Sequence, residues 1–192
     1  MKSLKFFASE LVLGAMVALL SVLVALAAYQ SSLADSKEAD LNVEGQKQLT
    51  DSNSLYLEAN QFIIYDYTMY DGWYVNEGKD DETAEYYLAN FSDQLNANIE
   101  RGGDLFDPQY YDEMYTEAAG LYDEAIANFE SAQQAGDRAD TLQLGVLIFA
   151  VGLALAAYGS LLEKESSLRI LFGIGSIVGL IFGLIVFFGA LA

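Results

Sequence analysis

Cysteine and histidine are both absent from this chain of 192 residues, and proline occurs once, at position 108. The absence of cysteine excludes disulfide scaffolds, thiolate metal sites and cysteine nucleophiles. The absence of histidine excludes imidazole metal sites and catalytic sets of the Ser-His-Asp or Cys-His type. The sequence therefore predicts a protein that is not an enzyme and that holds no resident cofactor or metal.

Basic residues are also scarce, since nine Lys and Arg stand against 28 Asp and Glu, for a formal net charge of -19. A nucleic-acid backbone is bound through Lys and Arg contacts to its phosphates, so no nucleic-acid partner is expected. Yet 53% of the residues are hydrophobic. This combination is rare in one soluble domain and predicts that apolar and charged residues are segregated along the chain.

Three apolar stretches are long enough to cross a bilayer, which takes roughly 20 mostly apolar residues. They cover residues 11–28, 142–162 and 170–192. The first is interpreted as an uncleaved anchor; the alternative is a secretory signal cleaved near Ala34, whose apolar core would normally be shorter. The sequence thus predicts three regions: residues 1–30 as a cytoplasmic tip and first span, 31–140 as an acidic helical domain, and 141–192 as two further spans.

Basic residues near the ends of the spans predict the orientation, because short basic segments stay cytoplasmic. Lys2 and Lys5 precede the first span, and Lys164 and Arg169 lie in the link between the second and third. The segment 31–140 holds 25 of the acids and five of the bases. We therefore expect a multi-pass protein of the cell membrane, with the lipid bilayer around its spans and the acidic domain extracytoplasmic.

The acidic segment is predicted to be helical, because residues 31–101 contain three glycines and no proline. Its apolar residues recur three and four positions apart, as on one face of a helix. A first long helix is expected to continue the first span. Its predicted face consists of Leu55, Tyr56, Ala59, Phe62, Ile63, Tyr70, Trp73 and Tyr74.

Two further helices are expected before the second span. One follows the turn at residues 78–81 and is stopped by Gly102 and Gly103; its predicted face is Ala84, Leu88, Phe91, Leu95 and Asn98. The other begins at the capping residue Asp107, has Pro108 in its first turn, and runs on into the second span. The predicted fold class is all-α: three transmembrane helices, with an extracytoplasmic helical bundle or stalk between the first and second.

Small residues recur every four positions in two of the spans. The third span contains Gly175, Gly179 and Gly183, and the second contains Gly152, Ala156 and Ser160. Rows of this kind let helices approach closely in lipid, where association depends on packing. The pattern predicts a helix-packing surface, either within one subunit or between copies in a homo-oligomer.

Other candidate sites lie in the acidic domain. Tyr70, Trp73 and Tyr74 could form an aromatic surface for a partner, or could pack in the core. Asp66 points toward the apolar face and needs a donor, which a Tyr hydroxyl or Arg101 could supply; a ligand-binding acid is the alternative.

Two acidic runs, residues 80–82 and 112–113, lack the spacing of a dedicated calcium loop, so they are interpreted as solvated helix starts, with weak cation binding as the alternative. Asn90 begins an Asn-Phe-Ser triplet that fits the N-glycosylation pattern.

Several short motifs resemble those of a group of uncharacterised prokaryotic three-span membrane proteins. They are Ala28-Tyr29-Gln30-Ser31, Glu58-Ala59-Asn60, Trp73, Gly136-Asp137 and Leu147-Ile148-Phe149-Ala150. The resemblance covers nearly the whole chain and implies one anchor helix, a helical domain outside the membrane and two closing spans. It implies no activity, and this chain departs from the group in its acidity and its scarcity of Arg.

The functional expectation is a structural, scaffolding or accessory membrane protein that self-associates or docks onto a larger membrane complex. The alternative is an extracytoplasmic ligand-binding or sensory module that acts through a separate partner. Residues 163–169 offer too short a cytoplasmic link to carry an output domain.

Overall fold

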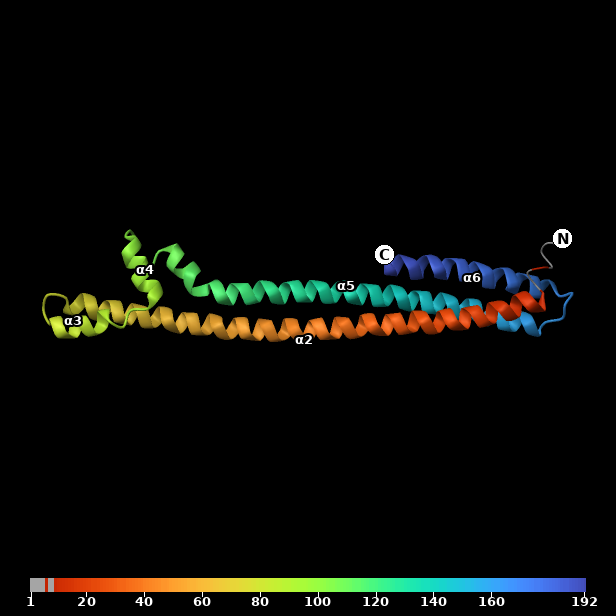
Figure 1. The fold of residues 1–192 in the computed structure, drawn as a ribbon, viewed down its shortest axis with the longest axis horizontal. Coiled ribbons are helices and arrows are strands. Elements are labelled where there is room, and N and C mark those ends of the chain that lie inside the picture. Colours follow the sequence, from red (N-terminus) through yellow and green to blue (C-terminus); the bar gives the residue numbers. More distant parts are fainter. Residues whose placement is uncertain (1–5, 7–8) are drawn as a thin grey trace. The chain divides into compact units, whose positions relative to one another are not determined.

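The computed structural model describes Phe6 and residues 9–192, and within these it contains five helices and no strand (Figure 1). The predicted all-α fold class is confirmed. The helices are α2 (Glu10–Asn76), α3 (Asp81–Leu88), α4 (Asp93–Arg101), α5 (Pro108–Leu161) and α6 (Ser167–Leu191). Three of them, α2, α5 and α6, are long and apolar enough to cross a membrane, which indicates a membrane protein. Lys2 and Lys5, used to predict the orientation, lie outside the described residues.

The chain divides into two units. Unit 1 comprises residues 1–41 and 130–192, and unit 2 comprises residues 42–129. Both α2 and α5 are unbroken across the unit boundaries. This continuity confirms that the first and third predicted helices extend the first two apolar stretches.

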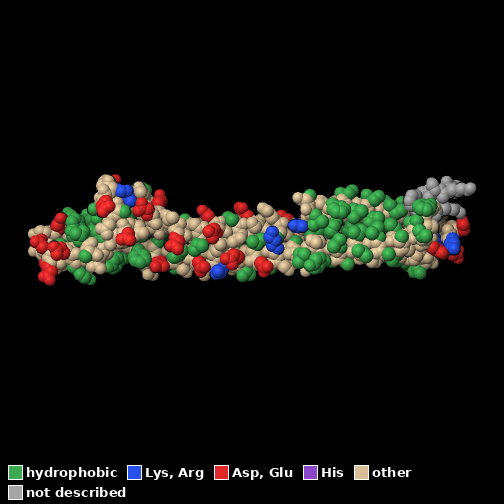
Figure 2. All heavy atoms as spheres, viewed as in Figure 1, with side chains coloured by type: hydrophobic (Ala, Val, Ile, Leu, Met, Phe, Trp, Pro, Cys, Tyr) green, Lys and Arg blue, Asp and Glu red, His purple; other side chains and the backbone are tan. Residues whose placement is uncertain are grey.

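Unit 1 is built from the first part of α2, the second part of α5, and α6. Its buried cluster combines five large side chains with two alanines. Along α5 the buried positions recur at intervals of three or four residues: Ala132, Ala135, Ala139, Leu142, Gly145, Phe149, Gly152, Ala156 and Gly159. Such a repeat presents one narrow stripe to neighbouring helices, and its small residues let the backbones approach closely. Figure 2 shows hydrophobic side chains gathered over α6.

Unit 2 is built from the second part of α2, the short helices α3 and α4, and the start of α5. Ile63, Phe91, Leu95 and Tyr110 form its buried cluster. Figure 2 shows carboxylates spread over the surface of this unit. Its fold therefore depends on a small aromatic and aliphatic core under an acidic surface.

The buried face of α2 in unit 2 is narrower than the predicted one. Its buried residues are Gly45, Ser52, Ala59, Ile63 and Asp66. Tyr56, Phe62 and Tyr74 were assigned to this face, but they are 50%, 49% and 66% exposed. The reason is that few helices pack on α2, so they cover only a stripe of it and leave the flanking aromatic residues in contact with solvent.

The prediction of one helix between residues 81 and 102 was wrong. α3 ends at Leu88 and α4 begins at Asp93, so the segment contains two helices. Ser92 interrupts the helix because its backbone is extended, with ψ 161°, and its hydroxyl accepts a hydrogen bond from the Leu95 amide, 3.0 Å away. The break exposes Leu88 and lets Phe91 enter the core.

The end of α4 and the start of α5 lie where the sequence predicts them. Gly102 and Gly103 have φ angles of +71° and +101°, which glycine adopts without a Cβ penalty, and they follow directly on α4. At the start of α5, the Asp107 carboxylate accepts a hydrogen bond from the Tyr110 amide at 2.7 Å, with Pro108 as the first helical residue. Buried Asn98 holds the intervening loop by accepting from the Phe106 amide at 2.8 Å.

Candidate functional site

The glycine row of α6 lies against α5 of the same chain. A Cβ atom at position 179 would lie 3.2 Å from the Cα atom of Gly152 and 3.6 Å from the carbonyl oxygen of Ile148. At position 183 a Cβ atom would overlap the Phe149 ring, and at Gly175 it would lie 3.0 Å from the Leu155 side chain. Within unit 1 the row therefore serves contacts inside the subunit.

The small residues predicted on the second span divide between two faces. Gly152 and Ala156 are buried, whereas Ser160 is exposed and its hydroxyl donates to the Ala157 carbonyl at 2.6 Å. The buried row of glycines is instead Gly145, Gly152 and Gly159. Their spacing of seven residues corresponds to two helical turns, and this signal was present in the sequence.

Asp66 is the most enclosed charged group of unit 2, with a side chain that is fully buried. Its carboxylate accepts hydrogen bonds from the Ser92 amide at 3.1 Å, the Ser92 hydroxyl at 2.5 Å and the Tyr110 hydroxyl at 2.7 Å. The predicted Tyr donor is thus Tyr110. Through these hydrogen bonds the carboxylate connects α2 with α4 and α5, so its role is to hold the three helices together.

Arg101, the other donor considered for Asp66, binds elsewhere. Its guanidinium lies 2.9 Å from a Glu113 carboxylate oxygen and 3.3 Å from the Asp107 carboxylate. These ion pairs join the end of α4 to the start of α5. Arg101 therefore has a structural role in unit 2.

Several tyrosines of this unit are held in their neutral form. Burial, with the hydrogen bond to Asp66 and its negative charge, raises the pKa of the Tyr110 phenol. The hydrogen bond between the Tyr67 and Tyr111 hydroxyls, followed by burial, raises the pKa of Tyr111 to about 12. Burial also raises the pKa of Tyr115, whose hydroxyl donates to Asn60 at 2.9 Å. At neutral pH these phenols are hydrogen-bonding groups.

The aromatic trio predicted as a partner surface is only partly available. Tyr70 and Trp73 are half-buried, and each lies 6.3 Å from the Phe91 ring, measured between ring centroids. Tyr74 is 66% exposed and lies 6.3 Å from Tyr70 in a stacked arrangement. Tyr70 and Trp73 therefore extend the core, and Tyr74 alone presents most of its surface to solvent.

Of the acidic runs, Asp80 caps α3: its carboxylate accepts from the Thr83 hydroxyl at 2.8 Å and from the Thr83 amide at 3.2 Å. These hydrogen bonds, the hydroxyl's first, lower the pKa of Asp80. No group of three or more metal-ligating side chains occurs among the described residues.

The side-chain amide of Asn90, the residue that begins the Asn-Phe-Ser triplet, donates to the Tyr86 backbone carbonyl at 2.7 Å.

A groove in unit 2 brings together residues that the sequence did not single out. It lies between α2, the start of α4 and the start of α5, and apolar side chains that include Phe62, Phe91 and Met114 line it. Three carboxylates also line it, one from each helix: Glu58, Asp93 and Glu117. Within the described part of the chain, none of the three forms an ion pair. The groove could not be predicted from the sequence, because its three walls are distant along the chain.

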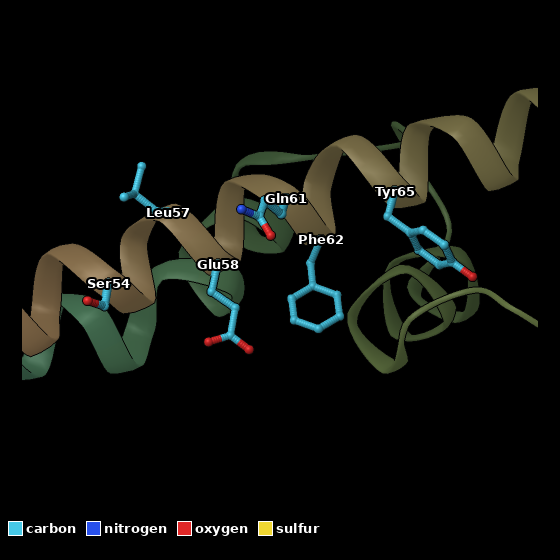
Figure 3. A pocket seen from close by; sticks show the side chains of 6 residues that line it. All are labelled: Ser54, Leu57, Glu58, Gln61, Phe62 and Tyr65. Atoms are coloured by element: carbon cyan, nitrogen blue, oxygen red, sulfur yellow. The ribbon is translucent and has the colours of Figure 1, made fainter.

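The groove adjoins a shallow hollow on the outer surface of α2, shown in Figure 3. The two share Glu58 and Phe62 as lining residues. In Figure 3, Glu58, Phe62 and Tyr65 project from the same side of the helix. Phe62 and Tyr65 are 49% and 42% exposed, so the combined surface offers apolar contact area beside negative charge. We call this combined surface the acidic groove.

Comparison with known proteins found no matching family model, no matching curated protein and no matching solved structure. The resemblance to three-span membrane proteins therefore stays a prediction.

Proposed function

We propose that this chain is a non-enzymatic accessory protein of a larger complex in the cell membrane. In this proposal α2, α5 and α6 anchor it in the lipid bilayer, and unit 2 lies on the extracytoplasmic side and docks onto a partner. The acidic groove carries the proposal, because it combines an apolar lining with three carboxylates that have no basic neighbour. Exposed apolar surface of this kind is typical of interaction sites.

Charge favours a basic partner over a second copy of this chain. Unit 2 contains 19 acidic residues and three basic ones, Lys47, Lys79 and Arg101. Two such units would repel each other at close range, whereas a Lys- or Arg-rich amphipathic segment would complement the groove. The glycine row of α6 could otherwise support self-association, but Gly179 already contacts Gly152 within one subunit.

The size of the acidic groove favours a protein segment over a small ligand. Its α2 wall extends from Ser54 to Tyr65, which is about 17 Å at the rise of an α-helix. That length accommodates about three turns of a partner helix. The ligand-binding or sensory alternative would instead require a small ligand to bind there.

The extracytoplasmic placement of unit 2 is proposed from two basic residues, Lys164 in the α5–α6 link and Arg169 in the first turn of α6. Lys164 lies 3.3 Å from the Glu10 carboxylate, and the guanidinium of Arg169 donates to the Leu162 carbonyl at 2.7 Å. By the positive-inside rule this end of the spans is cytoplasmic. Protease added to spheroplasts should then digest unit 2, and its protection until the membrane is permeabilised would contradict this side.

Native mass spectrometry of the full chain, purified from its own membranes with the co-purifying proteins identified, tests the accessory role. We expect a stoichiometric complex with a different membrane protein. The matched variants are a groove triple, Glu58→Gln, Asp93→Asn and Glu117→Gln, and a surface triple, Glu85→Gln, Glu100→Gln and Asp112→Asn. Both remove three negative charges, and the three surface residues are exposed outside the groove.

The groove triple should lose the complex and the surface triple should keep it. A homo-oligomer with no other protein would contradict docking and support the alternative of self-association. A monomer without any partner would contradict the accessory role.

A further inference from the structure

A second hollow, in unit 1, has the opposite charge to the acidic groove. α2 contributes Gln30, Leu33, Ala34 and Lys37 to its lining, and α5 contributes Ser131, Gln134, Ala135 and Arg138. It encloses about 480 Å³. The chain has nine basic residues in all. Two of them, Lys37 on α2 and Arg138 on α5, line this hollow.

Neither Lys37 nor Arg138 takes part in an ion pair within the described part of the chain. Acidic residues are nearby in the sequence; Asp40, for example, is three positions beyond Lys37, a spacing at which helical side chains can pair. Two unpaired cations in one hollow of a protein this acidic indicate a site for an anion.

The position of the hollow along the helices identifies the source of the anion. The first apolar stretch ends at residue 28, two residues before Gln30 and nine before Lys37, and the second begins at residue 142, four residues after Arg138. Four residues of helix span about 6 Å, which is comparable with the headgroup layer on one side of a bilayer. Figure 2 shows Lys and Arg side chains beside the hydrophobic surface of unit 1.

Apolar and polar lining groups complete the chemistry. Leu33 is 47% exposed and offers contact to the upper part of an acyl chain. The amides of Gln30 and Gln134 and the hydroxyl of Ser131 are hydrogen-bond donors that suit phosphate oxygens. We propose that this hollow binds the phosphodiester headgroup of one anionic phospholipid, with Lys37 and Arg138 as its cationic ligands. The site is independent of the docking proposed for unit 2.

The test uses the full chain in nanodiscs that contain equal amounts of phosphatidylglycerol and phosphatidylcholine. Native mass spectrometry after transfer to detergent counts the lipids that each chain retains. We expect the parent to retain one phosphatidylglycerol in preference to phosphatidylcholine. Lys37→Gln combined with Arg138→Gln should lower the retained fraction at least about fivefold, because both charged contacts to the phosphate are lost.

The matched control is Lys47→Gln with Lys79→Gln, which removes two positive charges outside the hollow. It should retain the lipid as the parent does, and circular dichroism should show that both double variants keep their helices. Equal retention by the Lys37/Arg138 variant and the parent would overturn the proposal, and so would equal retention of the two lipids.

A parallel titration of the parent with inorganic phosphate, in phosphatidylcholine nanodiscs, separates the two sources of phosphate. If phosphate binds saturably through Lys37 and Arg138 and no lipid is retained, the ligand is a free anion and the lipid proposal is overturned. Absence of such binding, together with retained phosphatidylglycerol, supports the headgroup.

Discussion

Asp66 and its donors link three helices of unit 2 through a single carboxylate. The donors are Ser92, which also caps α4, and Tyr110 in the first turn of α5. A buried carboxylate is tolerated only when hydrogen bonds replace its lost hydration, and here three do so. This residue therefore determines where α4 and α5 lie against α2 within the unit.

We expect Asp66→Asn to lower the free energy of unfolding of unit 2 by about 1.5–3 kcal/mol, the usual contribution of hydrogen bonds to a charged group. Trp73 is the only tryptophan and packs against the core of this unit, so its fluorescence during urea denaturation reports the change. Asp71→Asn, an exposed change on the same helix, should have little effect. Equal stability of the Asp66 variant and the parent would show that the carboxylate is dispensable.

The hydrogen-bonded tyrosines make the stability of unit 2 decrease at alkaline pH. Tyr111 has its pKa raised from 10.0 to about 12, so between these values the folded state keeps a proton that the unfolded state releases. The resulting stabilisation is complete below pH 10 and is lost as the pH rises through about 12. The same urea titration, repeated across this range, should give a falling free energy of unfolding.

Tyr111→Phe should reduce the slope of that pH dependence, because one raised pKa is removed with the hydroxyl while those of Tyr110 and Tyr115 remain. Tyr86→Phe, at an exposed tyrosine of the same unit, is the control and should leave the slope unchanged. An identical slope in the parent and in Tyr111→Phe would refute the role of the Tyr67–Tyr111 pair.

Among whole elements, those with local signals were predictable. The start of α5 follows from Asp107 and Pro108, which act on their own first turn, and the end of α4 follows from two adjacent glycines. The break between α3 and α4 was missed although Ser92 caps α4 locally, and the hydrogen bond between Ser92 and Asp66, 26 residues earlier, could not be read from the sequence. A stripe with helical spacing continued through the break, so periodicity alone indicated one helix.

The glycine row of α6 was equally visible in the sequence, but its contact was not. The sequence allowed packing within a subunit or between copies, and only the approach of Gly179 to Gly152 identifies a neighbour. The acidic groove and the basic hollow escaped prediction for a related reason, since residues from different helices form each of them.

Gly179→Leu should disrupt the packing of α6 on α5, because a side chain there must displace backbone atoms of α5. Overpacking of this kind costs about 1–3 kcal/mol. Gly189→Leu is the matched control on the same helix, since a Cβ atom there meets nothing within 4 Å. Thermal unfolding in nanodiscs, followed by circular dichroism, compares the two. Equal melting temperatures would place the Gly179 face in contact with lipid.

At the scale of the whole molecule, charge and hydrophobicity are segregated along the chain. Composition and apolar runs sufficed to predict this separation and the three candidate spans. They did not predict which acidic residues share a groove. Asp66 and Asp107 serve the fold, whereas Glu58, Asp93 and Glu117 line a groove without basic partners.

Self-repulsion among the acids of unit 2 should make its stability depend on salt. The screening length falls from about 30 Å at 10 mM to about 3 Å at 1 M, so unfavourable interactions weaken over that range. We expect the melting temperature reported by Trp73 fluorescence to rise with sodium chloride. A melting temperature that is constant or falls would mean that the ion pairs of Arg101 outweigh the repulsion.

The acidic groove of unit 2 is proposed to dock a basic segment of a membrane partner. Site-specific photo-crosslinking in intact cells tests it most directly, with a photoreactive amino acid at position 62, inside the groove, and at position 86, outside it. Both parent side chains are exposed aromatic residues, Phe62 and Tyr86. We expect one discrete adduct from position 62, to a Lys- or Arg-rich amphipathic segment, and none from position 86. No adduct at position 62, or the same adducts from both positions, would contradict it.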